Sequence, residues 1–566
     1  MSKNILKNKR SCVFILLFVL GTSVWLGGCD TAYKYDITDG IDNNGASEPD
    51  ITIDTEGGID VSMYEKARIF PGLVDTAKEE RINATIELDL NKQYIDSITL
   101  GVSKVPQPIY STGLYAGAGE QVAITVEDNT MGLSVIVGSH MDDLTELAPY
   151  QRMPLVYVAK ALFPGKNIIK NPLGGPIWIK KSLGLNASGT CSLKIEGVYK
   201  SPDFVIGETD LQDWKRRISE TTVPWLEIRG KHFAFTVQKD RVLDNLESIS
   251  STLQEVGKEW DEAIEEFFFE YYGLKIDKDA EEKERAPEFP FRVVLDVQVL
   301  GNLYLRNSDY AIVAINNTYM LEEMLNLRTL RTGNSVALLS AINSMCTYRS
   351  RNNPWPADYR AVANAIPLYR IGKKNFSKEN AFGEIFPGEE NITTLFPKAI
   401  EYAMADSSKW AKEDAATKYD DKTAYKAFDL LSLIQLANYD NNNWEAMEYL
   451  NLKAKEERSI DNSTLSYVFR RLCDYFKQNL CPFFDYWGVE QLDEDRKYAE
   501  QYPLMDKKIW EYNPLNPQQV KDYDASSYCY RHSRRDWKVS AYDKDYGVNY
   551  DGDSRKPESV SYTHLT

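Results

Sequence analysis

Apolar and polar residues alternate with a period of two along much of residues 61–235, which is the spacing of strands with one buried face. One such run has its apolar members at Val122, Ile124 and Val126. A second run, at Leu133, Val135 and Val137, follows after a short turn, so we expect the two runs to pair as a hairpin. TCSLKIEGVYK, residues 190–200, repeats the pattern. Strands of this kind predict a β-sandwich domain over residues 61–235.

Beyond about residue 240 the apolar residues recur every three or four positions, which is the spacing of amphipathic helices. PFRVVLDVQV, residues 290–299, interrupts this pattern as a strand. Further helices are predicted at about residues 317–330, 335–350, 394–414, 420–438 and 463–480. We therefore predict a mostly helical domain with a small sheet over residues 236–525. The fold class expected for the whole chain is α+β multidomain.

The first 60 residues have the pattern of a targeting segment followed by a tether. Basic KNILKNKR precedes the apolar run CVFILLFVLGTSVW, which ends in LGGC at Cys29. This resembles a bacterial lipobox, so we predict a signal peptide over residues 1–28 and lipid attachment at Cys29. A transmembrane anchor is the alternative, but the apolar run is short for one. Polar residues 29–60 would be a flexible tether, and the chain would be an outer-membrane lipoprotein that faces the cell surface or the periplasm.

The C-terminal residues 530–566 differ in character from the helical region before them. DWKVSAYDKDYGVNYDGDSRKPESV is polar and strand-like, and it resembles the start of a discoidin-like, coagulation-factor C-type sugar-binding module. The last residues, VSYTHLT, resemble translated sequencing adapter, which indicates a truncated module. A disordered extension is the alternative interpretation.

The charge and the small motifs exclude several classes of function. The 566 residues carry a net charge of −18, which argues against nucleic acid as a partner because binding a polyphosphate needs clustered Lys and Arg. GxSxG, phosphate-loop and GxGxxG motifs do not occur. The cysteines are scattered without a CxxC pair, so the sequence predicts neither a zinc ribbon nor a disulfide framework.

The stretch TGNSVALLSAINSMCTYR, residues 332–349, predicts a buried helix that Asn334 or Ser335 could cap. It carries small polar residues four positions apart, at Ser340 and Ser344. The chain has four histidines, His140, His232, His532 and His564, so none lies in this helix or near it in sequence. Two side chains at this spacing project from the same face of a helix.

Several segments resemble the enhancin-like metallopeptidases, peptidase family M60, which act on mucin. The resemblance rests on PIYSTGLYAGAGEQVAITV, GLSVIVGSHMDD, RMPLVYVAKALFPGKNIIKNPLGGPIWI, SPDFVIGETDLQDWK and PFRVVLDVQV, in that order over roughly residues 105–300. It implies a β-sandwich followed by a gluzincin-like catalytic domain, and substrates that are O-glycosylated proteins. Such enzymes hold zinc with HExxH on one helix and a glutamate on the next.

The zinc-binding positions of that family are degenerate in this chain. By the resemblance, Ser340 and Ser344 stand in the two histidine places and Ala341 in the place of the general base. Ala361, in RAVANAIPLYRI, stands where the third ligand is expected. Serine is a poor zinc ligand, and alanine can neither bind metal nor move a proton. We therefore predict a pseudoenzyme with no metal and no cofactor.

The predicted function is non-catalytic binding of a glycoprotein or a mucin-type glycan, with the membrane contacted through the lipid anchor and no nucleic acid bound. Exposed indoles could stack on sugar rings, and the candidates are Trp178, Trp214, Trp225 and Trp355. A structural role is the alternative for each of them. Two alternatives remain for the whole chain, an active zinc peptidase with unusual ligands and an outer-membrane scaffold.

Overall fold

The structure is a computed structural model, and it describes a large part of the chain from residue 64 to residue 524. The described residues are 64–128, 130–146, 149–184, 188–299, 305–347, 354–355, 357–375, 396–397, 399–400, 422–440, 444–457, 465–487, 491–514 and 520–524. The predicted signal peptide, Cys29, the tether and the discoidin-like tail lie outside these residues, as does most of the predicted helix 394–414.

The N-terminal part is rich in β-structure, as predicted. Its strands follow the order β5-β4-β7-β2-β8-β3-β6 in one sheet, and β1 pairs with β8. The strands are β1 (Ile82–Asp89), β2 (Ile109–Ala116), β3 (Gln121–Val126), β4 (Leu133–Val137), β5 (Val158–Leu162), β6 (Gly165–Lys170), β7 (Gly175–Lys181) and β8 (Thr190–Lys200). Buried side chains from both ends of this order belong to one apolar cluster, so the sheet folds over into two packed layers.

The expected hairpin between β3 and β4 is wrong. β3 pairs with β6 and β8, whereas β4 pairs with β5 and β7. Val122 and Ile124 of β3 nevertheless share one apolar cluster with Val135 and Val137 of β4. The two runs alternate because each faces the same core from a different layer, and the connection between them crosses from one layer to the other.

A second sheet of six strands follows, in the order β13-β14-β12-β11-β10-β9. Its strands are β9 (Phe204–Val205), β10 (Trp225–Arg229), β11 (Phe233–Gln238), β12 (Phe291–Asp296), β13 (Leu305–Asn307) and β14 (Ile312–Ile315). β12 lies within the predicted strand 290–299 and is parallel to both of its neighbours. All six of its residues are buried, as expected for a strand covered on both faces.

This pairing corrects the predicted domain limit at residue 235. That limit falls inside β11, and β9, β10 and β11 belong to the second sheet rather than to the sandwich. The first sheet ends with β8 at Lys200. The error arose because β10 and β11 form an ordinary antiparallel hairpin, whose local pattern does not say which sheet it joins.

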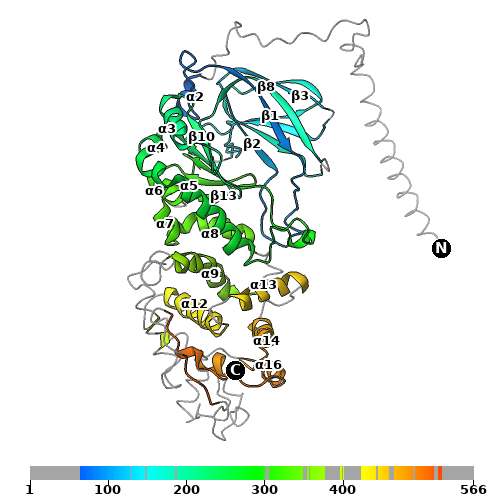
Figure 1. Cartoon of the computed structure of the whole chain (residues 1–566), viewed down its shortest axis with the longest axis vertical. Coiled ribbons are helices and arrows are strands. Elements are labelled where there is room, and N and C mark those ends of the chain that lie inside the picture. The colour runs from blue at the N-terminus through cyan, green and yellow to red at the C-terminus, as the bar shows by residue number, and fades with distance from the viewer. Residues whose placement is uncertain are drawn as a thin grey trace, which may run out of the picture. The chain divides into compact units, whose positions relative to one another are not determined.

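Helices make up most of the remaining described residues (Figure 1). Before the second sheet is complete they are α2 (Tyr64–Ile69), α3 (Leu211–Glu220), α4 (Lys239–Leu243), α5 (Leu246–Glu262), a π-helix η1 (Ala263–Phe269) and a 3₁₀ turn η2 (Glu282–Glu284). After it come α6 (Thr318–Leu325), α7 (Leu327–Arg331), α8 (Val336–Cys346), α9 (Ala357–Asn375), α12 (Lys422–Tyr439), α13 (Glu445–Glu457), α14 (Leu465–Phe476), α15 (Cys481–Tyr486), α16 (Asp493–Ala499) and a 3₁₀ turn η4 (Ile509–Glu511). A β-rich part followed by a mixed α/β part confirms the coarse fold prediction.

The helix α5 is fixed to the second sheet and to α6 by Trp260. Its fully buried indole lies with its ring centroid 5.3 Å from that of Phe235 on β11. The indole N–H donates a hydrogen bond to the carbonyl oxygen of Met324 on α6 at 2.8 Å. An aromatic anchor of this kind contributes both apolar burial and a satisfied polar group. It therefore sets the position of α6, and so of the helices that follow it.

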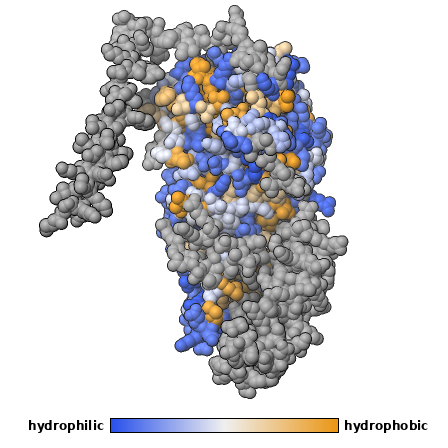
Figure 2. Space-filling model, turned by 180° about the vertical axis from the view of Figure 1, so that it is seen from behind, coloured by the Kyte–Doolittle hydropathy of each residue, from blue (hydrophilic) through white to orange (hydrophobic). Residues whose placement is uncertain are grey.

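Hydrophobic residues on the molecular surface are scattered rather than gathered over one element. Figure 2 shows one face, on which hydrophobic and hydrophilic residues are interspersed. The most exposed large apolar side chains, Ile69, Ile98 and Met131, lie in separate parts of the sequence. Single exposed apolar residues are normal on soluble surfaces. Within the described residues, no helix has the length and apolar character needed to cross a membrane.

Candidate functional site

The helix α8 carries three of the four degenerate zinc-motif positions, and α6 fixes its start. Ser335 precedes α8 but makes no side-chain cap to it; its hydroxyl instead donates to the carbonyl oxygen of Glu323 at 2.7 Å. The Glu323 carboxylate accepts from the backbone N–H of Leu338 at 2.9 Å. A negatively charged carboxylate at a helix N-terminus also interacts favourably with the positive end of the helix dipole. The expected capping by Asn334 or Ser335 is therefore replaced by a cap from a neighbouring helix.

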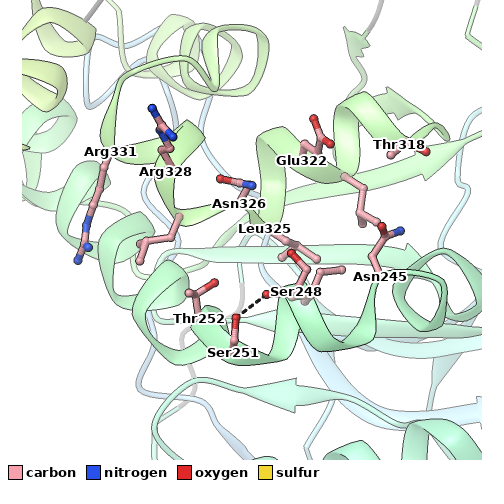
Figure 3. A pocket seen from close by; sticks show the side chains of 13 residues that line it. Asn245, Ser248, Ser251, Thr252, Thr318, Glu322, Leu325, Asn326, Arg328 and Arg331 are labelled. Atoms are coloured by element: carbon pink, nitrogen blue, oxygen red, sulfur yellow. Dashed lines mark hydrogen bonds between the residues drawn. The ribbon is translucent and has the colours of Figure 1, made fainter. Parts of the chain in front are cut away.

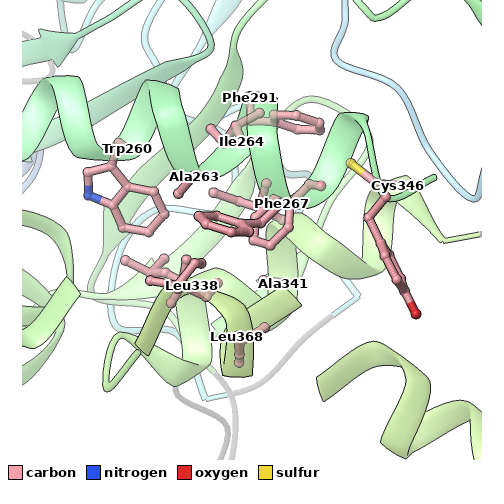
Figure 4. Packing of buried hydrophobic residues seen from close by; sticks show 14 of the residues in the cluster. Trp260, Ala263, Ile264, Phe267, Phe291, Leu338, Ala341, Cys346 and Leu368 are labelled. Carbon is pink, nitrogen blue, oxygen red and sulfur yellow. The ribbon is translucent and has the colours of Figure 1, made fainter. Parts of the chain in front are cut away.

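The three motif positions on α8 differ in their surroundings. Ser340 is exposed, and Ser344 is half-buried with its hydroxyl donating to the carbonyl oxygen of Ala341 at 2.7 Å. Ala341 is buried, and Figure 4 shows it between Phe267 of the π-helix and Leu368 of α9. The methyl group at 341 thus completes an apolar contact. The Ser344 hydroxyl proton is donated to a backbone carbonyl group, and Ala341 has no polar atom in its side chain. Neither Ser344 nor Ala341 is therefore arranged to bind a cation or transfer a proton.

The next helix, α9, is tied to α8 by a buried amide. The Asn343 side chain donates to the carbonyl oxygen of Asn364 at 2.7 Å. Two tyrosines that follow the π-helix reach the same turn of α9: Tyr271 donates to the carbonyl oxygen of Ala363, and Tyr272 to the Asn364 side chain, each at 3.3 Å. These contacts hold the two helices that would carry a zinc site in a defined relation. Ala361 lies in α9, but its side chain is outside the described part of the chain.

A segment from the N-terminal part covers the C-terminal end of α8. Backbone N–H groups of Ser103 and Lys104 donate to the carbonyl oxygens of Thr347 and Met345, at 2.7 and 3.1 Å. The Lys104 ammonium also donates to the carbonyl oxygen of Ser308 at 3.2 Å. The last carbonyl groups of a helix need partners from outside it, and here the β-rich part supplies two. The end of α8 is thereby joined to residues that precede β2.

A cavity of about 190 Å³ lies beside this junction. Its walls include Met345 of α8, Arg292 of β12, Tyr310, and Tyr94 and Gln107 from the covering segment. It combines aromatic rings with amide and guanidinium groups, which is the mixture that small polar ligands require. Its contact with α8 is made through Met345. Ser340, Ala341 and Ser344 are not among the residues that line this cavity.

Two buried ion pairs involve β12, and the first of them joins it to the β-rich part. Arg152 donates to both carboxylate oxygens of Asp296 at 2.9–3.0 Å, and both side chains are fully shielded from solvent. Burial alone would raise the pKa of Asp296, but the neighbouring His140 ring and the Arg152 guanidinium hold that pKa below its usual value. Burial lowers the pKa of His140, whose ring bonds the Leu295 carbonyl oxygen at 2.9 Å through Nε2. A proton on Nε2 lets the ring donate in this contact.

The second pair lies at the other end of β12. Arg292 donates to Glu227 of β10 at 2.8 Å and stacks on the ring of Trp178 of β7 at 4.5 Å from its centroid. Burial lowers the pKa of Arg292, although Glu227 opposes that shift. The nearby Asp203 carboxyl has a raised pKa, first because it is buried and then because of the Glu227 charge. Arg292 and Glu227 are buried and paired with each other, which indicates a structural role for this pair.

The structure corrects the expectation that four indoles offer faces to a sugar. Trp178, Trp214, Trp225 and Trp355 are all buried, with at most 3% of their surface exposed. The first three donate their ring N–H to protein groups, namely Glu227, the Pro202 carbonyl and the Pro71 carbonyl. Trp355 packs among residues of α12, α14 and α15. A buried indole has no free face for stacking, so these residues support the fold.

Two family models match adjoining segments of the chain. Residues 80–194 match the N-terminal domain of M60-like peptidases, and residues 197–333 match peptidase M60, enhancin and enhancin-like. The limit between the two matches falls within β8, close to where the first sheet ends. The models therefore divide the chain near the place where its sheets divide it.

Curated relatives match over a larger part of the chain at low identity. TRPM8 channel-associated factor 3 of Mus musculus is 24% identical over 72% of this chain and 40% of its own length. TRPM8 channel-associated factor 2 of Homo sapiens is 27% identical over 67% of this chain and 37% of its own length. The chain thus spans about two fifths of the length of these relatives.

Solved structures of similar fold include bacterial M60 domains. ZmpB metallopeptidase from Clostridium perfringens has a TM-score of 0.57 at 17% identity, covering 77% of this chain and 83% of that chain. The M60 catalytic domain of ZmpC from the same organism, solved with the sialyl T antigen, has a TM-score of 0.56 at 16% identity and covers 76% and 82%. A metallopeptidase from Bacteroides thetaiotaomicron has a TM-score of 0.54 at 14% identity and covers 75% and 72%. At these identities the likeness shows a shared fold.

Proposed function

Starting from membership of the M60 and enhancin-like peptidase family, which the family models support over residues 80–333, we propose that this chain binds glycoproteins without cleaving them. The observation that carries the proposal is the chemistry of α8. Ser340, Ala341 and Ser344 supply one exposed hydroxyl, one buried methyl group and one hydroxyl bonded to the backbone. A zinc peptidase needs two imidazoles and a carboxylate there.

The frame around α8 is intact, which favours binding over complete loss of function. Asn343 still ties α8 to α9, and the cavity beside Met345 remains open to a ligand. Function depends on such local sites rather than on the fold itself. The ligand class comes from the family: we propose an O-glycosylated, mucin-type glycoprotein. The ZmpC domain, a structural neighbour, was solved with the sialyl T antigen.

The proposal is tested with the full chain on purified mucin glycoprotein, by measuring binding and cleavage in parallel. We expect binding that survives a metal chelator, and no new fragments on a gel. Tyr310→Ala should weaken binding, because it removes an aromatic wall of the cavity beside α8. Tyr150→Ala is the matched control, since Tyr150 is exposed and lies outside that cavity. Cleavage that the chelator abolishes would instead establish an active peptidase with unusual ligands.

We also propose that a lipid on Cys29 anchors the chain to the outer membrane, with a flexible tether up to residue 60. The basic and apolar runs before LGGC support this. Metabolic labelling with a radioactive fatty acid should mark the wild-type chain and not Cys29→Ala. Equal labelling of both chains would overturn the assignment.

A protein partner is the second candidate function, and the names of the curated relatives favour it. The matched mammalian proteins are called channel-associated factors, which describes association with another protein. A scaffold of this kind would use the same enzyme-like fold with no need for zinc. Chemical crosslinking in intact cells, followed by purification of the tagged chain, should then recover one defined membrane protein. Mucin binding without such a partner would favour the glycoprotein binder.

A further inference from the structure

A cavity of about 400 Å³ opens between α5, α6 and α7, away from the degenerate motif. Its lining residues are Asn245, Ser248, Ile249, Ser251, Thr252, Thr318, Leu321, Glu322, Leu325, Asn326, Leu327, Arg328 and Arg331, and Figure 3 shows how they lie. None of them belongs to α8 or α9. The volume is within the range of small-molecule sites, roughly 300–1,000 Å³.

The floor of this cavity is apolar, and its walls are polar. Ile249, Leu321 and Leu325 are nearly fully buried and form the floor. Hydroxyl groups of Ser248 and Thr252 line one side from α5, and Figure 3 places Thr318 and Asn245 toward the end opposite the arginines. Apolar contact combined with several hydroxyl and amide groups suits a ligand that carries both C–H surface and hydroxyl groups.

The positive charge at one end of the cavity is only partly neutralised. Arg331 is held by Glu259 at 2.9 Å and lies 3.8 Å from Glu255. Arg328 is exposed, and no acidic side chain of the described residues forms an ion pair with it. A sharp turn presents Arg328, since Asn326 ends α6 and also caps α7 by accepting from the Thr329 N–H at 3.0 Å. An unpaired guanidinium beside a concave polar surface is suited to a carboxylate, which it can bind through two parallel N–H bonds.

We propose that this cavity binds a small hydroxylated carboxylate of the sugar-acid class, with its carboxylate on Arg328 and its hydroxyl groups along α5. Glu322 also lines the cavity and carries no ion pair to a described residue, so it disfavours ligands of high negative charge such as polyphosphates. The cavity therefore suits a ligand with a single carboxylate, which would pair with the one unpaired arginine. The inference does not rest on the proposed function, because the cavity and α8 share no lining residue.

The test is isothermal titration of the full chain with D-glucuronate and D-galacturonate, with D-glucose and D-galactose as the matched neutral sugars. We expect a uronate to bind at least about tenfold more tightly than its neutral counterpart, as one charge-assisted contact provides. Arg328→Gln should remove that preference, and Arg328→Lys should restore part of it, because the charge returns without the planar fork.

Glu322→Gln distinguishes an acid from a ligand that carries an ammonium group. Loss of the opposing carboxylate should tighten uronate binding by about twofold to fivefold. Weaker binding by this variant would mean that Glu322 holds a cation, and the sugar-acid assignment would be wrong. Equal binding of uronate and neutral sugar, absence of binding at 10 mM, or an unchanged preference in Arg328→Gln would also overturn it. Circular dichroism of each variant verifies its fold, and Arg328 and Glu322 are exposed positions.

Discussion

Replacing Asp296 with asparagine should destabilise the junction between the β-rich part and the second sheet. Asp296 is the last residue of β12, and Arg152 lies in the connection between β4 and β5. The pair has three N–O contacts of 2.9–3.0 Å and no solvent exposure. Asparagine keeps the shape but leaves the guanidinium charge buried without a counter-charge.

The expected loss in unfolding free energy is about 3–5 kcal/mol, the usual cost of removing one partner of a buried ion pair. This corresponds to a change of roughly a hundredfold to several thousandfold in the unfolding equilibrium. A double variant, Arg152→Met with Asp296→Leu, should recover much of that loss, because both charges are removed together. Measured against the single variants Arg152→Met and Asp296→Leu, the coupling energy should be at least about 2 kcal/mol.

The assay is equilibrium urea unfolding at pH 7, followed by tryptophan fluorescence. Glu247→Gln is the control, since Glu247 forms an exposed pair with Lys215 and its loss should not measurably change stability. The stabilisation that ionised Asp296 provides is fully present above 3.8, the pKa of the carboxyl in the unfolded chain. It is lost as the pH falls through the lower pKa that Asp296 has in the folded protein. The difference between wild type and Asp296→Asn should therefore shrink below pH 4. A single-variant loss under about 1 kcal/mol would refute the reasoning that this pair is dry and essential.

Three further predictions concern other parts of the fold. Burial lowers the pKa of Lys455 to about 7. The wild type should therefore gain stability between pH 7 and 10 relative to Lys455→Met, by up to about 1.4 kcal/mol per pH unit in urea unfolding. Equal pH profiles would contradict this. Gly257→Ala should destabilise despite its higher helix propensity, because the new methyl carbon would lie 2.1 Å from the Ile206 side chain; a raised melting temperature would be the contrary result. Ser340→His with Ser344→His should raise zinc affinity measured by competition with a chelating dye, since the two positions are one helical turn apart; unchanged affinity would show that the register on α8 is wrong.

The sequence predicted the larger features because they depend on local periodicity. Alternation identified β3, β4 and β8, an apolar run identified β12, and three- and four-residue spacing identified the helices near α5, α8 and α14. The true partners of β3 and β4 could not be predicted in this way. Two strands that lie in opposite layers show the same alternation as two strands that pair with each other. The assignment of β10 and β11 to the second sheet depends on contacts with β12, more than 50 residues later.

The candidate site was predictable in part. Absence of histidine from residues 233–531 is visible in the sequence, and the helix predicted over residues 335–350 is present as α8. The sequence did not reveal that Glu323 caps the start of α8, because that contact joins two separate helices. It also did not reveal that Ser103 and Lys104 bond to the end of α8, because these residues are far from α8 in sequence. Burial of the four tryptophans was also missed, since the sequence does not say whether an indole in a strand or loop faces the core.

Zinc analysis of the purified full-length chain tests directly whether the chain binds a catalytic metal. The chain would be incubated with excess zinc, passed through a desalting column and assayed for zinc by mass spectrometry. We expect about 0.1 zinc per chain or less, because hydroxyl and methyl groups stand where the M60 peptidases that the chain resembles would hold the ion with imidazoles and a carboxylate. About one tightly held zinc per chain, with zinc-dependent cleavage of a mucin glycoprotein, would contradict the proposal of a non-catalytic binder.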